Sequence, residues 1–368
     1  MKAKIAVLPG DGIGPEVIAE GLRCLRAIAD AFGHEFSLAE LPFGGAAIDP
    51  FGNPLPESTL KSCLEADAVL LGAVGGPEWS APEAKVRPEQ GLLGLRKALG
   101  VYANVRPVKV HRALLSASTL KSEILEGVDL VFVRELTGGI YFGEKRRDSR
   151  SATDVCTYTV EEVERIVRVA AGMARRRRRK LVSIDKSNVL ETSKLWREVT
   201  ARVLRAEFPD VLLEHMLVDS AAMHLTRRPR DFDVLVTENM FGDILTDEAS
   251  MLSGSLGLLP SASLGEGARG LYEPIHGSAP DIAGENIANP YGTILSVALL
   301  LRHSLALDAE AEVLERSVSA AIGQGARTRD IASVGSRAFS TREVGDVVLE
   351  EVRRIGQDMA QNRRTGSE

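Results

Sequence analysis

Two aspartates at helical spacing are the first residues in the chain that suggest chemistry. Asp243 and Asp247 lie in a segment, 240–252, whose apolar residues recur every three or four positions, which predicts a helix. Residues four apart share one face of a helix, and two carboxylates there repel each other. A hard cation that prefers oxygen ligands, Mg²⁺ or Mn²⁺, would turn this repulsion into attraction. The segment also follows a predicted strand at 233–237, and α/β sheets bind ligands beyond such strand ends. We therefore favour a metal site over the alternative of a solvated acidic face.

Several further polar residues fall at predicted strand ends or tight turns, namely Arg96, Arg106, Arg134, Tyr141, Lys186 and Asp219. Each has an ordinary structural explanation by itself, as a surface ion pair, an exposed lysine or a core tyrosine. Arginine side chains bind carboxylates through two parallel hydrogen bonds, and a metal ion binds an oxygen. Together with the two aspartates, these residues indicate a site for a small di-acid.

Short apolar strands alternate with helical segments along the chain, which predicts an α/β protein with a mixed sheet. A glycine-rich turn follows the first strand, but Pro15 occupies the position of the third glycine in a GxGxxG fingerprint. The pattern therefore does not predict a Rossmann dinucleotide site. A ligand role for the turn stays open.

The composition of the segments between these elements predicts their local structure. Residues 140–158 mix charged, small and aromatic side chains and predict a hairpin or arm, whereas Thr159 and Glu162 have the spacing of a helix capping box. The segments 253–265 and 272–290 are rich in glycine, serine or proline and are predicted to be loops.

Length and composition exclude several classes of protein. The 368 residues allow two domains, and the net charge of −6 gives no sign of binding to nucleic acid or a membrane surface. The longest apolar stretch, 294–301, is far below membrane-spanning length. Cys24, Cys63 and Cys156 lack paired or metal-like spacing, which favours reduced thiols in a soluble cytoplasmic protein. The basic run Arg175–Lys180 ends a predicted helix, where cations suit the helix dipole, so nucleic-acid binding is the weaker interpretation.

Eight motifs, in order along almost the whole chain, resemble the β-decarboxylating, metal-dependent hydroxyacid dehydrogenases, the family of isocitrate and isopropylmalate dehydrogenases. They are LPGDGIGPE (8–16), RPEQGLLGLRK (87–97), YANVRPVK (102–109), VRELTGGIYFG (133–143), DKSNVL (185–190), FGDILTDE (241–248), GSLGLLPSASLG (254–265) and EPIHGSAPDIAGENIANP (273–290).

The resemblance implies a two-domain α/β fold of the isopropylmalate dehydrogenase type, with a mixed sheet and distinct from the Rossmann class. One domain, 1–101 plus 255–368, lies on the cofactor side. The other, 102–254, carries the dimer interface, the arm at about 140–158 and the metal site. Members are homodimers with shared active sites. We therefore expect Lys186, Asn188, Val189 and Asp219 to reach the partner subunit's site and Asp219 to complete the metal site of Asp243 and Asp247.

The resemblance also implies an activity, namely oxidative decarboxylation of a 2-hydroxy di-acid with NAD⁺ and Mg²⁺ or Mn²⁺. Lys186 is expected to act as base or relay and Tyr141 to protonate the enolate carbon. The carboxylates are held by Arg96, Arg106 and Arg134, and the substrate is further contacted by Asp219 and Asn188. An apolar pocket of Leu92, Leu93 and the partner's Val189 suits the isopropyl group of 3-isopropylmalate, the leucine-pathway substrate, and disfavours isocitrate. D-Malate or tartrate is the alternative substrate.

A third set of residues is expected to bind the cofactor: Glu89, His276, Gly277, Ser278, Ala279, Asp281, Ile282 and Asn289. An acid at Asp281 can accept hydrogen bonds from the adenosine ribose and would repel a 2′-phosphate. NAD⁺ is therefore expected rather than NADP⁺.

Overall fold

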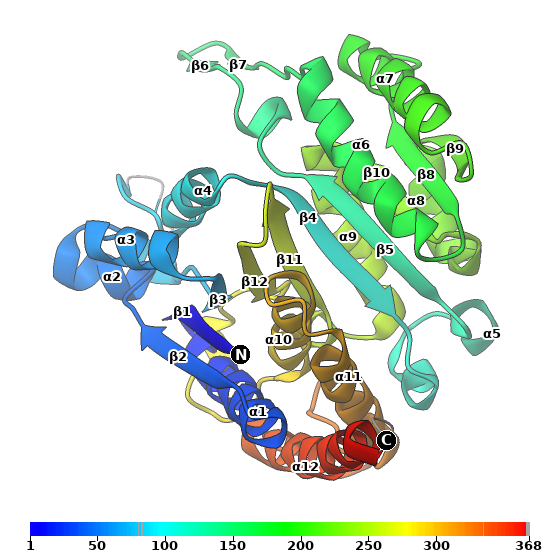
Figure 1. Ribbon diagram of the computed structural model, residues 1–368. Coiled ribbons are helices and arrows are strands. Elements are labelled where there is room, and N and C mark those ends of the chain that lie inside the picture. Colours follow the sequence, from blue (N-terminus) through cyan, green and yellow to red (C-terminus); the bar gives the residue numbers. More distant parts are fainter. Residues whose placement is uncertain (80, 82–83, 334, 366–368) are drawn as a thin grey trace. The chain divides into compact units, whose positions relative to one another are not determined.

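The computed structural model describes residues 1–79, 81, 84–333 and 335–365. The chain forms two compact units, Met1–Val101 with Gly254–Glu368 and Tyr102–Ser253 (Figure 1). Each unit is a sheet flanked by helices, which confirms the predicted α/β class. Among the described residues, no helix is long and apolar enough to cross a membrane. Cys24, Cys63 and Cys156 are all free thiols.

The sheet of the first unit is mixed and has the order β2-β1-β3-β12-β11. Neighbouring strands from β2 to β12 are parallel, and β11 runs antiparallel to β12. All residues of β3 are buried, as expected for an apolar strand in a sheet covered on both faces. The strands are β1 (Lys2–Gly10), β2 (Glu35–Glu40), β3 (Ala68–Ala73), β11 (Pro260–Gly265) and β12 (Gly270–Pro274).

The helices of the first unit include a packed group of four, α1, α10, α11 and α12 (Figure 1). Helix α1 begins with Pro15 in its first turn, where a missing N–H costs nothing, and ends at Gly33, whose φ of 71° suits glycine. The helices are α1 (Gly14–Phe32), α2 (Gly45–Phe51), α3 (Glu57–Glu65), α4 (Pro88–Leu99), α10 (Tyr291–His303), α11 (Asp308–Gly323) and α12 (Thr341–Thr365). Short 3₁₀ turns are η1 (Pro77–Trp79), η5 (Leu256–Leu258) and η6 (Pro280–Ile282).

The sheet of the second unit is also mixed, with the order β4-β5-β10-β8-β9. Strand β4 is antiparallel to β5, and the remaining pairs are parallel. The strands are β4 (Val101–Lys109), β5 (Asp129–Glu135), β8 (Lys180–Asp185), β9 (Leu212–Leu217) and β10 (Val234–Thr237). A separate hairpin of β6 (Lys145–Arg147) and β7 (Ala152–Asp154) lies within the segment 140–158.

The helices of the second unit start from clear local signals. Thr159 accepts a hydrogen bond from Glu162 N, and the Glu162 carboxylate accepts one from Thr159 N, so the predicted capping box is confirmed. Glu238 caps α9, accepting from Met240 N and Phe241 N. The helices are α5 (Ser122–Leu125), α6 (Val160–Arg175), α7 (Glu191–Glu207), α8 (Val218–Arg227) and α9 (Asn239–Ser253), with 3₁₀ turns η2 (Arg112–Ala117), η3 (Gly139–Tyr141) and η4 (Pro229–Asp231).

Three sequence-based boundaries are wrong. The segment 253–265 is not simply a loop, because Pro260–Gly265 forms β11, whose first four residues are buried. Its small side chains let it pack closely, and pairing with β12 overrides their weak strand propensity. Tyr272–Pro274 likewise belongs to β12. Asp219 lies in the first turn of α8 rather than at a strand end.

The basic run Arg175–Lys180 is tied into the second unit by carboxylates. Arg177 donates to Asp129 at 2.6 Å and to Asp233 at 2.8 Å, and the Asp233 side chain is only 1% exposed. The other contacts join Arg175 to Asp210, Arg178 to Asp233 and Lys180 to Glu214. The run therefore has structural partners that its helix-end position alone did not predict.

Candidate active site

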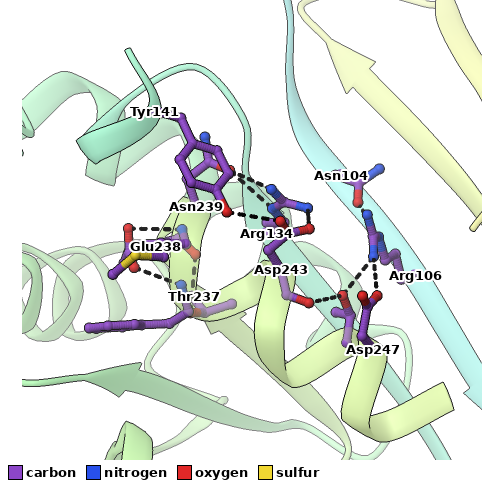
Figure 2. A network of polar contacts seen from close by, with 12 residues as sticks. Asn104, Arg106, Arg134, Tyr141, Thr237, Glu238, Asn239, Asp243 and Asp247 are labelled. Atoms are coloured by element: carbon purple, nitrogen blue, oxygen red, sulfur yellow. Dashed lines mark hydrogen bonds and ion pairs between the residues drawn. The ribbon is translucent and has the colours of Figure 1, made fainter. Parts of the chain in front are cut away.

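A polar network in the second unit brings together five of the predicted site residues (Figure 2). Arg106 comes from β4, Arg134 from β5 and Tyr141 from η3, while Asp243 and Asp247 lie one turn apart on α9. Helix α9 follows β10, which pairs with β5, and β5 pairs with β4. The sheet register thus aligns the arginine-bearing strands beside the acidic face of the helix.

Asp243 is the centre of the network. Arg134 Nη1 donates to its Oδ1, and the Tyr141 hydroxyl donates to its Oδ2 at 2.9 Å (Figure 2). The Arg134 guanidinium also lies 5.9 Å from the Tyr141 ring centroid. Partial burial raises the pKa of Tyr141, and the hydrogen bond and charge of Asp243 raise it further. The phenol therefore stays protonated at neutral pH.

Asp247 faces the second arginine. Arg106 Nη1 lies 3.6 Å from Asp247 Oδ1 and donates to Thr246 Oγ1 at 2.6 Å. Partial desolvation and the charge of Asp243 raise the pKa of Asp247, against the opposing effect of Arg106. The repulsion between the two aspartates is thus offset by one arginine each. Pairing with arginines therefore gives the two neighbouring aspartates a structural role, which their helical spacing alone did not predict.

Two buried asparagines orient the arginines and were missed by the sequence analysis. Asn239 Oδ1 accepts from Arg134 Nε at 3.1 Å and Nη2 at 2.8 Å, and its Nδ2 donates to Gly138 O at 3.3 Å. Asn104 Oδ1 accepts from Arg106 Nε at 2.6 Å. One signal was available in the sequence, because Asn104 and Arg106 are two apart on a strand and share a face.

A second cluster in this unit holds the other predicted residues. Lys186 Nζ donates to Asp219 Oδ1 at 2.7 Å, and this contact lowers the pKa of Asp219. Asn188 and Val189 are exposed in the turn after β8, with Val189 64% exposed. Asp219 pairs with Lys186 and is not brought into contact with the pair on α9.

The carboxylates on α9 are the type of ligand that a hard cation prefers, but they are too few to complete its coordination. Asp243 and Asp247 offer carboxylate oxygens with 38% and 67% of their side chains exposed. Within the described residues, no group of three or more His, Cys, Asp or Glu side chains could hold a metal ion. Mg²⁺ takes about six oxygen ligands, so substrate, water or a second copy of the chain would have to supply the rest.

Helix α4 in the first unit carries the predicted substrate-side residues. Arg96 Nη2 donates to Glu273 Oε1 at 2.7 Å, and its buried Nε finds no hydrogen-bond partner among the residues that the structure describes. Leu92 is half-buried against the core, whereas Leu93 is 40% exposed. The arginine is therefore held by an ion pair while one of its donors remains unsatisfied.

The predicted cofactor loop lies in the same unit. His276 Nδ1 is 2.9 Å from Gly277 O, and within the described part of the chain its buried Nε2 has no hydrogen-bond partner. Desolvation lowers the pKa of His276, so the ring is neutral and Nε2 is left as an acceptor. The half-buried Ala279 and Ile282 pack against an apolar cluster that includes Ile13.

The remaining loop residues differ in exposure. Ser278 is buried, Gly277 and Asp281 are exposed, and the buried Asn289 side chain bonds Asp330 and Tyr291 N. Gly277 has open space around it, as a Cβ placed there would have no atom of another described residue, its chain neighbours aside, within 4 Å. An orphaned acceptor, an apolar cluster and an open glycine are features that fit a dinucleotide.

Comparison with known proteins gives a consistent result. Residues 4–348 match the family model described as isocitrate/isopropylmalate dehydrogenase. A 3-isopropylmalate dehydrogenase from Anaeromyxobacter dehalogenans is 57% identical over 357 residues, covering 96% of this chain and 100% of the relative. One from Geobacillus kaustophilus is 58% identical over 346 residues, covering 93% of each.

Solved structures agree. An isocitrate dehydrogenase from Methylococcus capsulatus has a TM-score of 0.84 at 34% identity, over 95% of this chain and 99% of that one. A β-decarboxylating dehydrogenase from Thermococcus kodakarensis has a TM-score of 0.79 at 36% identity, over 96% and 97%. On this evidence the chain belongs to the isocitrate/isopropylmalate dehydrogenase family.

Proposed function

We propose that this protein oxidises 3-isopropylmalate with NAD⁺ and decarboxylates it to 4-methyl-2-oxopentanoate and CO₂, a step of leucine biosynthesis. The strongest support is the sharing of the Asp243 carboxylate by Arg134 and Tyr141. Arg134 is a cation that can bind an anionic substrate, Tyr141 is a proton donor, and Asp243 is a carboxylate that can bind a metal ion. The three side chains form one hydrogen-bonded group. More than half of the residues match those of proteins named 3-isopropylmalate dehydrogenase.

Asp243 and Asp247 would hold Mg²⁺ or Mn²⁺ together with Asp219 of the partner subunit. When bound, the cation supplies Lewis-acid stabilisation of negative charge on the substrate oxygens. It would also replace the arginines as the charge partner of the two aspartates. Arg134 Nη1 could then turn to a substrate carboxylate, while Asn239 keeps the rest of the guanidinium in place.

Proton transfers are assigned to two side chains. Lys186 of the partner subunit accepts the C2 hydroxyl proton as hydride leaves C2 for NAD⁺. Loss of CO₂ from the resulting β-keto acid leaves an enolate, and Tyr141 donates its phenolic proton to the enolate carbon. Arg96, Arg106 and Arg134 hold the carboxylates throughout, with Asn188 of the partner subunit as a further contact.

The homodimer is supported by two observations on the second unit. Met223 on α8 and Ile244 and Met251 on α9 are 60%, 62% and 48% exposed, and the two helices pack against each other. Apolar side chains exposed together on adjacent helices mark an interaction surface. The second observation is that one chain offers a metal ion two carboxylates on α9, and a second copy of the chain would supply a further ligand.

NAD⁺ is preferred over NADP⁺ in this proposal because Asp281 is an exposed carboxylate beside the half-buried Ile282. A carboxylate can accept bonds from ribose hydroxyls and repels a 2′-phosphate. A higher kcat/KM with NADP⁺ than with NAD⁺ would contradict this preference.

Substrate choice is assigned to Leu92, Leu93 and Val189 of the partner subunit. The exposed, apolar Leu93 and Val189 suit an isopropyl group and offer no partner for the third carboxylate of isocitrate. D-Malate or tartrate is the second candidate, since either would use the same arginines, lysine and aspartates.

A substrate panel tests the proposal. Purified protein with NAD⁺ and Mn²⁺ is given 3-isopropylmalate, isocitrate, D-malate or tartrate, and NADH formation is followed. The highest kcat/KM should belong to 3-isopropylmalate, and EDTA should abolish it. A lead for D-malate or tartrate would overturn the substrate assignment, and turnover of none would overturn the reaction.

A further inference from the structure

The glycine-rich turn between β1 and α1 contains a buried carboxylate with three backbone partners. Asp11 is 6% exposed, and its Oδ2 accepts hydrogen bonds from Gly45 N and Gly75 N, each at 2.8 Å. Its Oδ1 accepts from Ala46 N at 2.8 Å. These donors lie 34, 35 and 64 residues further along the chain. Asp11 thus ties its own turn to the start of α2 and to the segment around Gly75, both in the first unit.

The 10–14 turn, the start of α2 and the segment around Gly75 are packed tightly around this carboxylate. Gly44 has a φ of +73°, and a Cβ there would lie 2.6 Å from Asp11 Oδ2. Asp11 N donates to Ala73 O at 2.8 Å, and a Cβ on Gly10 would collide with the same carbonyl. A carboxylate has acceptor capacity for all three N–H groups and carries no hydrogen that would oppose them. An asparagine would have to turn an N–H group toward one donor.

Gly75 and the 10–14 turn, which Asp11 holds together, border two candidate cofactor residues. A Cβ on Gly75 would lie 3.3 Å from Glu89 Oε1 and 3.8 Å from Ser278 Oγ. Ile13 N donates to Ser278 O at 2.8 Å, and a Cβ on Gly12 would strike that carbonyl. Gly75 therefore lies against Glu89 and Ser278, which are far apart in the sequence.

We propose that Asp11 is a positioning residue for dinucleotide binding, because it fixes Gly75 and the 10–14 turn against Glu89 and Ser278. Asp11 acts through these loops and is not assigned a contact with the ligand. The inference rests on the proposed use of NAD⁺. It gives the glycine-rich turn, whose ligand role the sequence left open, a specific task.

The test compares two substitutions of Asp11 with a buried acid elsewhere in the same unit. NADH fluorescence titration gives the Kd, steady-state kinetics give KM for 3-isopropylmalate, and thermal unfolding gives Tm. Asp11→Asn should raise the NADH Kd about tenfold and Asp11→Ala up to about 10²-fold, since small displacements of positioning groups have effects of this size. The KM for 3-isopropylmalate should stay within about twofold.

The control is Glu20→Gln. Glu20 is 3% exposed and pairs with Arg23 on α1 and Arg342 on α12. Its substitution should lower Tm and leave the NADH Kd within about twofold. An unchanged NADH Kd in folded Asp11→Asn, or an equal rise in Glu20→Gln, would overturn the inference.

A second pair of variants covers the case in which both Asp11 variants fail to fold. Gly75→Ala and Gly52→Ala both place a side chain at positive φ, +111° and +67°, but only Gly75 faces Glu89 and Ser278. At Gly52, no atom of another described residue beyond its chain neighbours lies within 4 Å of the new Cβ. A rise in NADH Kd confined to Gly75→Ala is expected, and equal values for the two variants would overturn the inference.

Failure of the inference is distinguishable from failure of the proposed function. Wild-type protein that binds NADH but oxidises none of the substrates would overturn the reaction and leave the Asp11 comparison valid. Wild-type protein that turns over 3-isopropylmalate, beside an Asp11→Asn variant with an unaltered NADH Kd, would overturn the inference alone.

Discussion

At the scale of single residues, Tyr141 is held for proton transfer by its 2.9 Å hydrogen bond to Asp243. Tyr141→Phe removes the proton donor, so kcat should fall roughly 10²-fold, the usual size of an acid–base contribution. The change should appear in 4-methyl-2-oxopentanoate formation, with the KM for NAD⁺ unchanged. Tyr158→Phe is the matched control, because Tyr158 bonds Glu238 and Asn239 N at the start of α9. It should lower stability and spare most of kcat, and equal loss of kcat in both variants would contradict the role of Tyr141.

His276 gives a pH dependence whose sign follows from its burial. Desolvation depresses the pKa of His276 in the folded protein, so the neutral ring is favoured. Its contribution to stability is present above the ordinary histidine pKa of about 6.5 and is lost as pH falls through the depressed value. Protonation of Nε2 also removes the acceptor that we assign to the dinucleotide.

The expected result is a rise in the NADH Kd as the pH falls below the ordinary histidine pKa of about 6.5 and through the depressed pKa of His276, where the neutral ring is lost. Fluorescence titration across the pH range measures it. In His276→Gln, which keeps an acceptor but does not titrate, the rise should be much smaller. A variant that keeps the wild-type pH profile would contradict the assignment.

At the scale of elements, the basic run joins the end of α6 to β5 and β10. Arg177→Ala removes one of the arginines that pair with the buried Asp233. Unfolding in urea should show a loss of about 2–3 kcal/mol, because a buried carboxylate loses part of its compensation. Arg176→Ala, at an exposed position in the same run, should change stability by less than about 0.5 kcal/mol. Similar losses in both variants would contradict the structural role of the run.

Elements with strong local signals were predictable from the sequence. The three- and four-residue spacing of apolar residues predicted α9, and Thr159 with Glu162 predicted the start of α6. Strand β11 was not predictable, because serine, alanine and glycine favour strands weakly and its stability comes from pairing with β12. Strand β2, at the edge of the sheet beside β1, was also not predicted, although Phe36 and Leu38 alternate in it with polar residues.

The network around α9 was predictable only in part, because it too depends on contacts between residues far apart in the chain. The spacing of Asp243 and Asp247 placed both carboxylates on one helical face. Their arginine partners could not be assigned, since Arg134 is 109 residues from Asp243 in the chain. The supporting bonds of Asn239 and Asn104 depend on the pairing of β5 with β10 and with β4, a non-local register that periodicity does not reveal.

At the scale of the whole molecule, the proposal requires two copies of the chain, since Tyr141 of one subunit acts with Lys186 of the other. Lys186→Ala and Tyr141→Phe homodimers should each be nearly inactive. Co-expression with two different affinity tags isolates the hybrid dimer, in which one site carries both substitutions and the other carries neither. Hybrids should therefore recover roughly half of the wild-type kcat per dimer. Hybrids as inactive as their parents would contradict shared sites.

The proposed activity requires that a single enzyme both oxidises and decarboxylates 3-isopropylmalate. The most direct measurement supplies 3-isopropylmalate labelled in the carboxylate that is lost, with NAD⁺ and Mn²⁺, and follows NADH and labelled CO₂ in the same reaction. NADH and labelled CO₂ should form in equal amounts, and addition of EDTA should abolish both. NADH formed without labelled CO₂, or neither product from 3-isopropylmalate while another di-acid is turned over, would contradict it.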